Sequence, residues 1–211
     1  MKRVINLDNW NRKEHFKFFS ALDDPFWGIT TTVDFTSVYQ QSKNMEVSFF
    51  LYSVYFLLKC INATTAFKLR IENGEVVEYD KINISPTIGR EDGPFGFGFF
   101  EYDTDLSLFI ENAEKEIHRV KNSAGLSFSK DTARADVIRY SALPWFAFSE
   151  MKHAGSIQTG DSIPKISTGK LIQEKKKLLL PISISVHHGL VDGRNVAEFI
   201  QNLKDGQNNT L

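Results

Sequence analysis

Apolar positions along the chain recur in short runs at the spacings of helices and strands. The most apolar stretch, residues 47–58, is too short to span a bilayer and belongs to a buried helix predicted over residues 47–61. A second helix is predicted by a stripe at helical spacing: Leu106, Phe109, Ile110, Ala113, Ile117 and Val120. Shorter helical patterns lie over residues 14–22 and 195–204. Pro25 disfavours a helical conformation at Asp24, so the first of these helices should end before it.

Strand patterns occupy much of the remaining chain. We expect strands at residues 28–35, 83–88, 97–101, 137–141, 165–171 and 177–187. Asn73-Gly74, between residues 67–71 and 76–79, indicates a β-hairpin. The elements do not alternate as regular βαβ units, so the layer rule predicts an α+β fold, a two-layer sandwich in which helices pack on one face of a large mixed sheet. No linker or repeat divides the chain, so we expect one domain over residues 1–211.

Composition narrows the possible partners. The net charge of -1 gives no reason to expect nucleic acid or an anionic membrane. Cys60 is the single cysteine, so an intramolecular disulfide is excluded. The first residues lack the apolar stretch of a signal peptide, and we therefore expect a cytoplasmic protein.

Two histidines, His187 and His188, close the last predicted strand and precede Asp192. A histidine at the end of an apolar strand is held rigidly and can be kept neutral, which suits a general base. A histidine pair is more often a surface or core feature, and a zinc site would need a third ligand at a convincing spacing, so we expect no metal. Asp192 can cap the closing helix or pair with a distant cation.

The pattern H-H-x-x-x-D-G at residues 187–193 resembles the signature of coenzyme A-dependent acyltransferases. These include chloramphenicol acetyltransferase, dihydrolipoyl acyltransferase cores and peptide-synthetase condensation domains. Residues 141–145, S-A-L-P-W, and residues 9–16, N-W-N-R-K-E-H-F, are similar to further motifs of the chloramphenicol acetyltransferase family. Residues 167–170 give a weaker match. The resemblance runs from about residue 1 to 203, and the chain length favours this family over its relatives.

The resemblance implies roles for six residues. These are His188 as general base, Ser141 as oxyanion donor, Asp192 and Arg12 as a supporting ion pair, Ser167 in the oxyanion and water network, and Lys170 near the coenzyme phosphate. It further implies acetyl-CoA as co-substrate, a small hydroxylated acceptor, antibiotic resistance, and a homotrimer with active sites between subunits. His188 and Ser141 would then come from different chains.

The departures from the family pattern concern the acceptor. Phe19 stands where the family has a pocket tyrosine, and the loop at residues 23–27 differs. We expect a largely apolar acceptor pocket lined by Phe19, Trp27, Phe97 and Phe99, with two carboxylates at its edge. The Phe/Gly alternation at residues 93–100 suits either a close-lying planar ligand or a packed corner. Alternative functions are transfer to another hydroxylated or amine metabolite, or non-catalytic binding of a small ligand.

Overall fold

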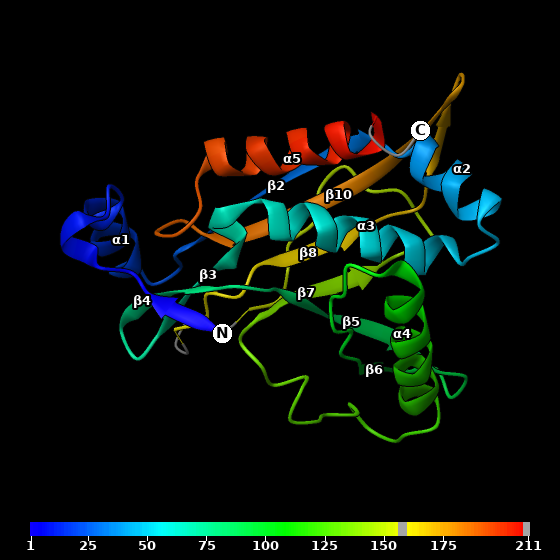
Figure 1. Ribbon diagram of the computed structural model, residues 1–211, viewed down its shortest axis with the longest axis horizontal. Coiled ribbons are helices and arrows are strands. Elements are labelled where there is room, and N and C mark those ends of the chain that lie inside the picture. Colours follow the sequence, from blue (N-terminus) through cyan, green and yellow to red (C-terminus); the bar gives the residue numbers. More distant parts are fainter. Residues whose placement is uncertain (156–159, 209–211) are drawn as a thin grey trace.

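Helices pack across one face of a large sheet (Figure 1). The computed structural model describes residues 1–155 and 160–208. The helices are α1 Lys13–Ser20, α2 Thr36–Asn44, α3 Phe49–Ala63, α4 Leu106–Lys121 and α5 Gly193–Asn208, with 3₁₀ turns at Leu7–Asn9 and Thr65–Lys68. The strands are β1 Lys2–Val4, β2 Phe26–Asp34, β3 Leu69–Glu72, β4 Glu75–Tyr79, β5 Asn83–Gly89, β6 Phe95–Phe97, β7 Val137–Ala142, β8 Lys165–Thr168, β9 Ile172–Glu174 and β10 Lys177–His187.

Within the described residues, the main sheet has seven strands in the order β2-β10-β8-β7-β5-β6, with β9 beside β10. β10 runs antiparallel to β2 and β8, whereas β7 is parallel to both β8 and β5. A smaller antiparallel sheet, β1-β4-β3, contains the hairpin turned by Asn73-Gly74. This arrangement confirms the predicted α+β fold with a large mixed sheet.

The core lies between the sheet and helices α3 and α5, which cross its near face in Figure 1. Alternation along β10 produces this arrangement, because Ile182, Ile184 and Val186 are fully buried among core side chains. α3 is apolar on most of its surface because its neighbours include α2, α4 and α5. None of the described helices has the length and apolar character to span a bilayer.

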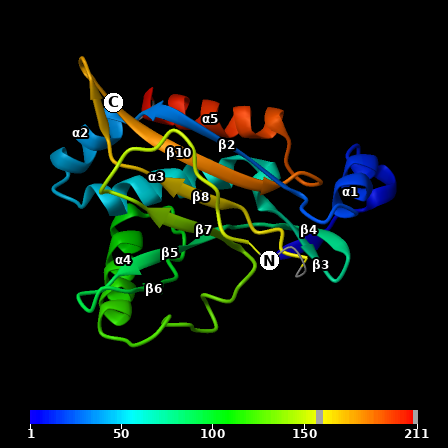
Figure 2. The same cartoon turned by 180° about the vertical axis from the view of Figure 1, so that it is seen from behind.

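The opposite sheet face is seen in Figure 2, where loops rather than helices cross the strands. Strand register places Thr30, Ser183, Ser167 and Ser141 side by side across four strands. Thr87 extends this line, since its Oγ1 lies 3.3 Å from Ser141 Oγ. We call these five residues the hydroxyl row. It gives the sheet a polar back face, in contrast to the apolar face under the helices.

Two expected strands need correction, and one helix was missed. The strand expected at residues 97–101 lies at Phe95–Phe97, and the one expected at 165–171 ends at Thr168. The helix Thr36–Asn44 was not predicted, because only Val38 and Ser42 on it are buried and no helical stripe results.

The Phe/Gly alternation belongs to a packed corner. A Cβ on Gly98 would lie 2.6 Å from Ile88 Cδ1, and one on Gly96 would meet Ser127 and Val120. The glycines therefore make room for the chain itself rather than for a ligand.

Candidate active site

His188 follows the last residue of β10 and is fixed from several sides. Its N–H donates to Pro25 O at 2.8 Å, and its carbonyl accepts from Arg12 Nη2 at 3.1 Å. The imidazole stacks on Phe19 with ring centroids 3.9 Å apart and an interplanar angle of 13°, and the Trp27 ring lies 5.4 Å away. Both backbone and ring are thus held before any substrate binds.

The two nitrogens of the His188 ring have different surroundings. Nδ1 is buried and has no hydrogen-bond partner among the described residues, while the residue as a whole is half-buried. Nε2 is therefore the nitrogen available to a substrate hydroxyl. A ring held rigidly with one nitrogen accessible has the geometry that a general base requires.

Asp192 supports the turn that follows His188. It forms an ion pair with Arg12, and its Oδ1 accepts the N–H groups of Arg194 and Asn195 at the start of α5. Both roles considered for Asp192 from the sequence, helix cap and cation partner, are present together. Burial opposes ionisation, but the hydrogen bonds from Asn195 and Arg12 prevail and hold the pKa of Asp192 below its usual value. Asp192 is therefore a fixed anion and has no proton to supply at neutral pH.

His187 occupies a different environment from its neighbour. Its side chain lies on the back face, 3% exposed, and Nδ1 accepts the Gly189 N–H at 3.1 Å. Burial lowers the pKa of His187 to about 4, with the His188 ring adding to the effect and Asp161 opposing it. The ring is thus neutral at physiological pH with its proton on Nε2. Sequence reasoning assigned His187 no role, although the alternation of β10 already separates the two histidines.

Ser141 and Ser167 lie in the hydroxyl row, far from His188 of the same chain. Ser167 is 1% exposed and pairs with Ser141 on one side and Ser183 on the other. From Ser183, β10 continues four more residues before it ends at His187, about 13 Å at the usual rise per residue. One chain therefore presents two half-sites, one around His188 and one around Ser141.

His153 joins the second half-site and was missed from the sequence. Its Nε2 lies 3.0 Å from Ser167 Oγ, and burial together with nearby Lys165 lowers its pKa. An isolated histidine in a loop carries no sequence signal of such a contact. No cluster of three or more potential metal ligands occurs in residues 1–155 and 160–208.

An apolar groove of about 420 Å³ opens beside Ser141, at the carboxyl ends of β7 and β8. Its lining includes Phe49, Phe50, Ala142, Leu143, Pro144, Trp145, Gly169 and Leu180. Trp145 is 74% exposed at this groove. Lys170 is exposed, and its N–H donates to Phe146 O at 2.9 Å, which brings it next to the same loop.

The four aromatic residues expected to line the acceptor pocket do not lie together. Phe19 and Trp27 contact His188, whereas Phe97 lies at the other edge of the sheet, in register with Thr87. The Phe97 ring stacks on Phe128 with centroids 5.3 Å apart. The guanidinium of Arg134 lies 4.9 Å over the ring of Phe99. Within one chain, Phe19 and Trp27 lie at the His188 half-site, whereas Phe97 lies beside Thr87 at the Ser141 half-site; their joint role in an acceptor pocket stays a prediction.

The fold and the placement of His188 fit an acyltransferase. The family model described as "Chloramphenicol acetyltransferase" matches residues 2–204. The chain therefore belongs to the chloramphenicol acetyltransferase family, as its motifs led us to expect.

Individual relatives agree with this assignment. The chain is 27% identical to chloramphenicol acetyltransferase 3 of Escherichia coli, over 98% of this chain and 97% of the relative. It is 28% identical to a chloramphenicol acetyltransferase of Staphylococcus aureus, with 98% and 97% covered. A solved chloramphenicol acetyltransferase superposes with a TM-score of 0.89 at 30% identity, over 97% of this chain and 99% of that one. A dihydrolipoamide acetyltransferase of Azotobacter vinelandii, 14% identical, shares the fold with a TM-score of 0.70 over 92% and 85%.

Proposed function

We propose that the protein transfers the acetyl group of acetyl-CoA to a hydroxyl of a small acceptor, and that chloramphenicol is one such acceptor. The observation that carries this proposal is the His188 site, in which the ring stacks on Phe19 and Nδ1 is buried, which leaves Nε2 as the nitrogen for an acceptor hydroxyl. His188 Nε2 takes the proton of the acceptor hydroxyl as the oxygen attacks the thioester carbonyl. When the tetrahedral intermediate collapses, the same nitrogen returns the proton to the departing thiolate. A positioned base of this kind contributes about 10²–10⁴ in rate.

Ser141 stabilises the negative charge that develops on the carbonyl oxygen. Its hydroxyl donates a hydrogen bond to the oxyanion, and Ser167 supports the same site directly or through water. The close pairing of the two serines in register supports this division of roles. Hydrogen-bond donors fixed in advance act most strongly where charge appears only in the transition state.

The apolar groove beside Ser141 is a suitable route for the coenzyme arm. Its lining includes Ala142 and also Thr87, whose Oγ1 lies 3.3 Å from Ser141 Oγ, and the exposed Trp145 gives it a flat apolar wall. Lys170 at the same loop supplies a cation for a coenzyme phosphate.

The complete active site forms between subunits of a homotrimer. The separation of the two half-sites within one chain supports this arrangement, because a base about 13 Å or more from the oxyanion donor cannot act on the same carbonyl. A neighbouring subunit supplies His188 to the Ser141 half-site.

Thiol release from acetyl-CoA, measured with chloramphenicol and a panel of alcohols and amines, tests the proposal. We expect turnover with chloramphenicol at a higher KM than a dedicated resistance enzyme has, because Phe19 lacks the hydroxyl of a pocket tyrosine. If thiol is released only with other alcohols or amines, one of those compounds and not chloramphenicol is the acceptor. Ligand binding without any thiol release would instead indicate a non-catalytic binding protein.

A further inference from the structure

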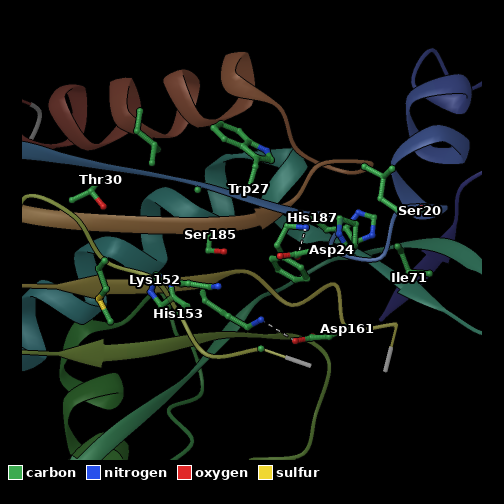
Figure 3. Close-up of a pocket in the computed structure, with 18 of the residues that line it drawn as sticks. Ser20, Asp24, Trp27, Thr30, Ile71, Lys152, His153, Asp161, Ser185 and His187 are labelled. Atoms are coloured by element: carbon green, nitrogen blue, oxygen red, sulfur yellow. Dashed lines mark hydrogen bonds and ion pairs between the residues drawn. The ribbon is translucent and has the colours of Figure 1, made fainter. Parts of the chain in front are cut away.

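A cavity of about 650 Å³ lies on the back face of the sheet, next to the His188 half-site (Figure 3). Strand residues form its floor, including Gly28, Ser185 and His187, and the loop before β8 forms a wall with His153 and Asp161. Figure 3 shows His187 and Ser185 on the strand and His153 and Asp161 across from them. Many of the side chains that line this cavity are polar, including Thr30, Lys152 and Ser185.

The cavity adjoins both half-sites. At one end Trp27 lines it and also lies beside the His188 ring. Toward the other end it is lined by Thr30 of the hydroxyl row and by His153, which is hydrogen-bonded to Ser167. An acceptor in this cavity is therefore close to the reacting groups of either half-site.

Two of the residues that line the cavity, Lys165 and Asp161, form an ion pair that is almost fully buried. Lys165 Nζ lies 3.2 Å from Asp161 Oδ2, and each side chain is only 8% exposed. The ammonium also sits 4.1 Å above the Phe26 ring. Asp161 accepts from Arg139 Nη1 at 3.2 Å and from the Ile163 N–H at 3.0 Å. Burying two charges is costly unless their remaining hydrogen-bonding capacity is used.

A donor and an acceptor held side by side select the ligand by its chemistry. A hydrocarbon group against Lys165 and Asp161 would desolvate the pair without replacing the lost hydrogen bonds. A carboxylate or phosphate can accept from Lys165 but cannot donate to Asp161, so it uses only half of the pair. A hydroxyl or amide can accept from Lys165 and donate to Asp161 at once. His187, which keeps its proton on Nε2, adds a neutral donor to the same cavity.

We propose that Lys165 and Asp161 are specificity-determining residues that bind a second hydroxyl or an amide of the acceptor, distinct from the hydroxyl that is acetylated. The inference rests on the proposed acetyl transfer and adds the class of acceptor. It makes acceptors with two neutral polar groups, rather than simple hydrophobic alcohols, the preferred substrates.

The test compares two matched acceptors, 2-phenylethanol and 1-phenyl-1,2-ethanediol, with acetyl-CoA as donor. The double variant Lys165→Met/Asp161→Asn removes both charges together, which avoids leaving one buried charge unpaired. We expect the kcat/KM preference for the diol to fall at least about tenfold, with the KM for acetyl-CoA unchanged. The control is Glu111→Gln/Lys115→Met, which removes an exposed ion pair on α4 and should leave the preference unaltered.

An unchanged preference in the folded double variant overturns the assignment of Lys165 and Asp161. If that variant does not fold, Lys165→Arg retains the charge but changes the donor geometry. Lys165→Arg should raise the KM for the diol and leave the KM for 2-phenylethanol unchanged. An equal change in both KM values contradicts the inference. If the native enzyme releases no thiol with any acceptor, the proposed function is contradicted as well. If the native enzyme turns over and the folded double variant keeps the same preference for the diol, only the specificity proposal is contradicted.

Discussion

At the scale of single residues, the two adjacent histidines have opposite surroundings and different uses. His188 stacks on Phe19 and has one accessible ring nitrogen, whereas His187 is buried on the back face and bonded to Gly189. Strand alternation alone produces this difference, because consecutive side chains point to opposite faces. The turn after β10 thus contains one histidine that we propose for proton transfer and one that bonds to the backbone beside it.

Ser141→Ala should lower kcat by about 10²–10³ with little change in either KM, because the lost hydrogen bond forms mainly in the transition state. Steady-state kinetics of thiol release measure this. Ser183→Ala, in the same hydroxyl row, is the matched control and should retain most of the activity. A normal kcat for Ser141→Ala would exclude this serine as the oxyanion donor.

His187 should make the native protein sensitive to acid. Its pKa of about 4 lies below the unfolded value near 6.5, so the unfolded chain binds the proton first. Stability from this group is full above about pH 6.5 and declines as the pH falls toward 4. His187→Asn keeps an acceptor for the Gly189 N–H but does not titrate, so its melting temperature should fall less than that of the native protein over this range. Parallel pH profiles for both proteins would refute the buried neutral state.

At the scale of elements, the turn between β10 and α5 is held by contacts from the distant N-terminus. Arg12 reaches both the Asp192 carboxylate and the His188 carbonyl, and the Trp27 indole N–H donates to Val191 O at 3.0 Å. The segment around α1 and the start of β2 therefore fixes the position of the catalytic turn. An N-terminal motif and a C-terminal motif, widely separated in sequence, form one structural unit.

A double-mutant cycle on Arg12→Met and Asp192→Asn should show coupling. The two side chains are in contact and partly buried, so we expect an interaction free energy of about 0.5–3 kcal/mol in unfolding experiments. Each single variant should also lose activity, since the turn that carries His188 loosens. Additive effects on stability would mean that the ion pair does not support the turn.

The sequence predicted elements well where one periodicity dominated. β10, with its regular alternation, was expected at its observed bounds, and α4 was identified by its apolar stripe. α2 was missed because its burial depends on neighbouring elements rather than on its own pattern. The ring contacts of Phe97 with Phe128 and of Phe99 with Arg134 likewise have no sequence signal, because they join segments that are distant along the chain.

Residues of the candidate site could be predicted from the sequence only where they belong to a recognisable motif. Arg12, Ser141, His188 and Asp192 were singled out by spacing and family resemblance. The Lys165–Asp161 ion pair and the His153 contact with Ser167 have no sequence signal, because they depend on where a long loop folds back over the sheet.

At the scale of the whole molecule, one chain contains two incomplete half-sites, and we propose that a trimer completes them. Light scattering coupled to size exclusion should give three times the chain mass of 24.1 kDa. A monomer with full activity would contradict the arrangement between subunits.

Mixed oligomers provide a sharper test of the shared site. His188→Ala and Ser141→Ala subunits are each expected to be nearly inactive, but co-refolded mixtures should regain activity. If each site takes one residue from each of two subunits, about a quarter of the sites in a random equal mixture contain both native residues. Recovery of about that fraction supports the shared site. No recovery, with mixed oligomers verified by differential tagging, would mean that each chain supplies both residues.

The central claim is that His188 is the general base of an acetyl-CoA-dependent acyltransferase. Thiol release with chloramphenicol should be compared for the native protein, His188→Ala and the exposed-histidine control His118→Ala. The account predicts that His188→Ala loses about 10²–10⁴ in kcat while remaining folded, and that His118→Ala matches the native enzyme. A folded His188→Ala protein with native turnover would contradict it.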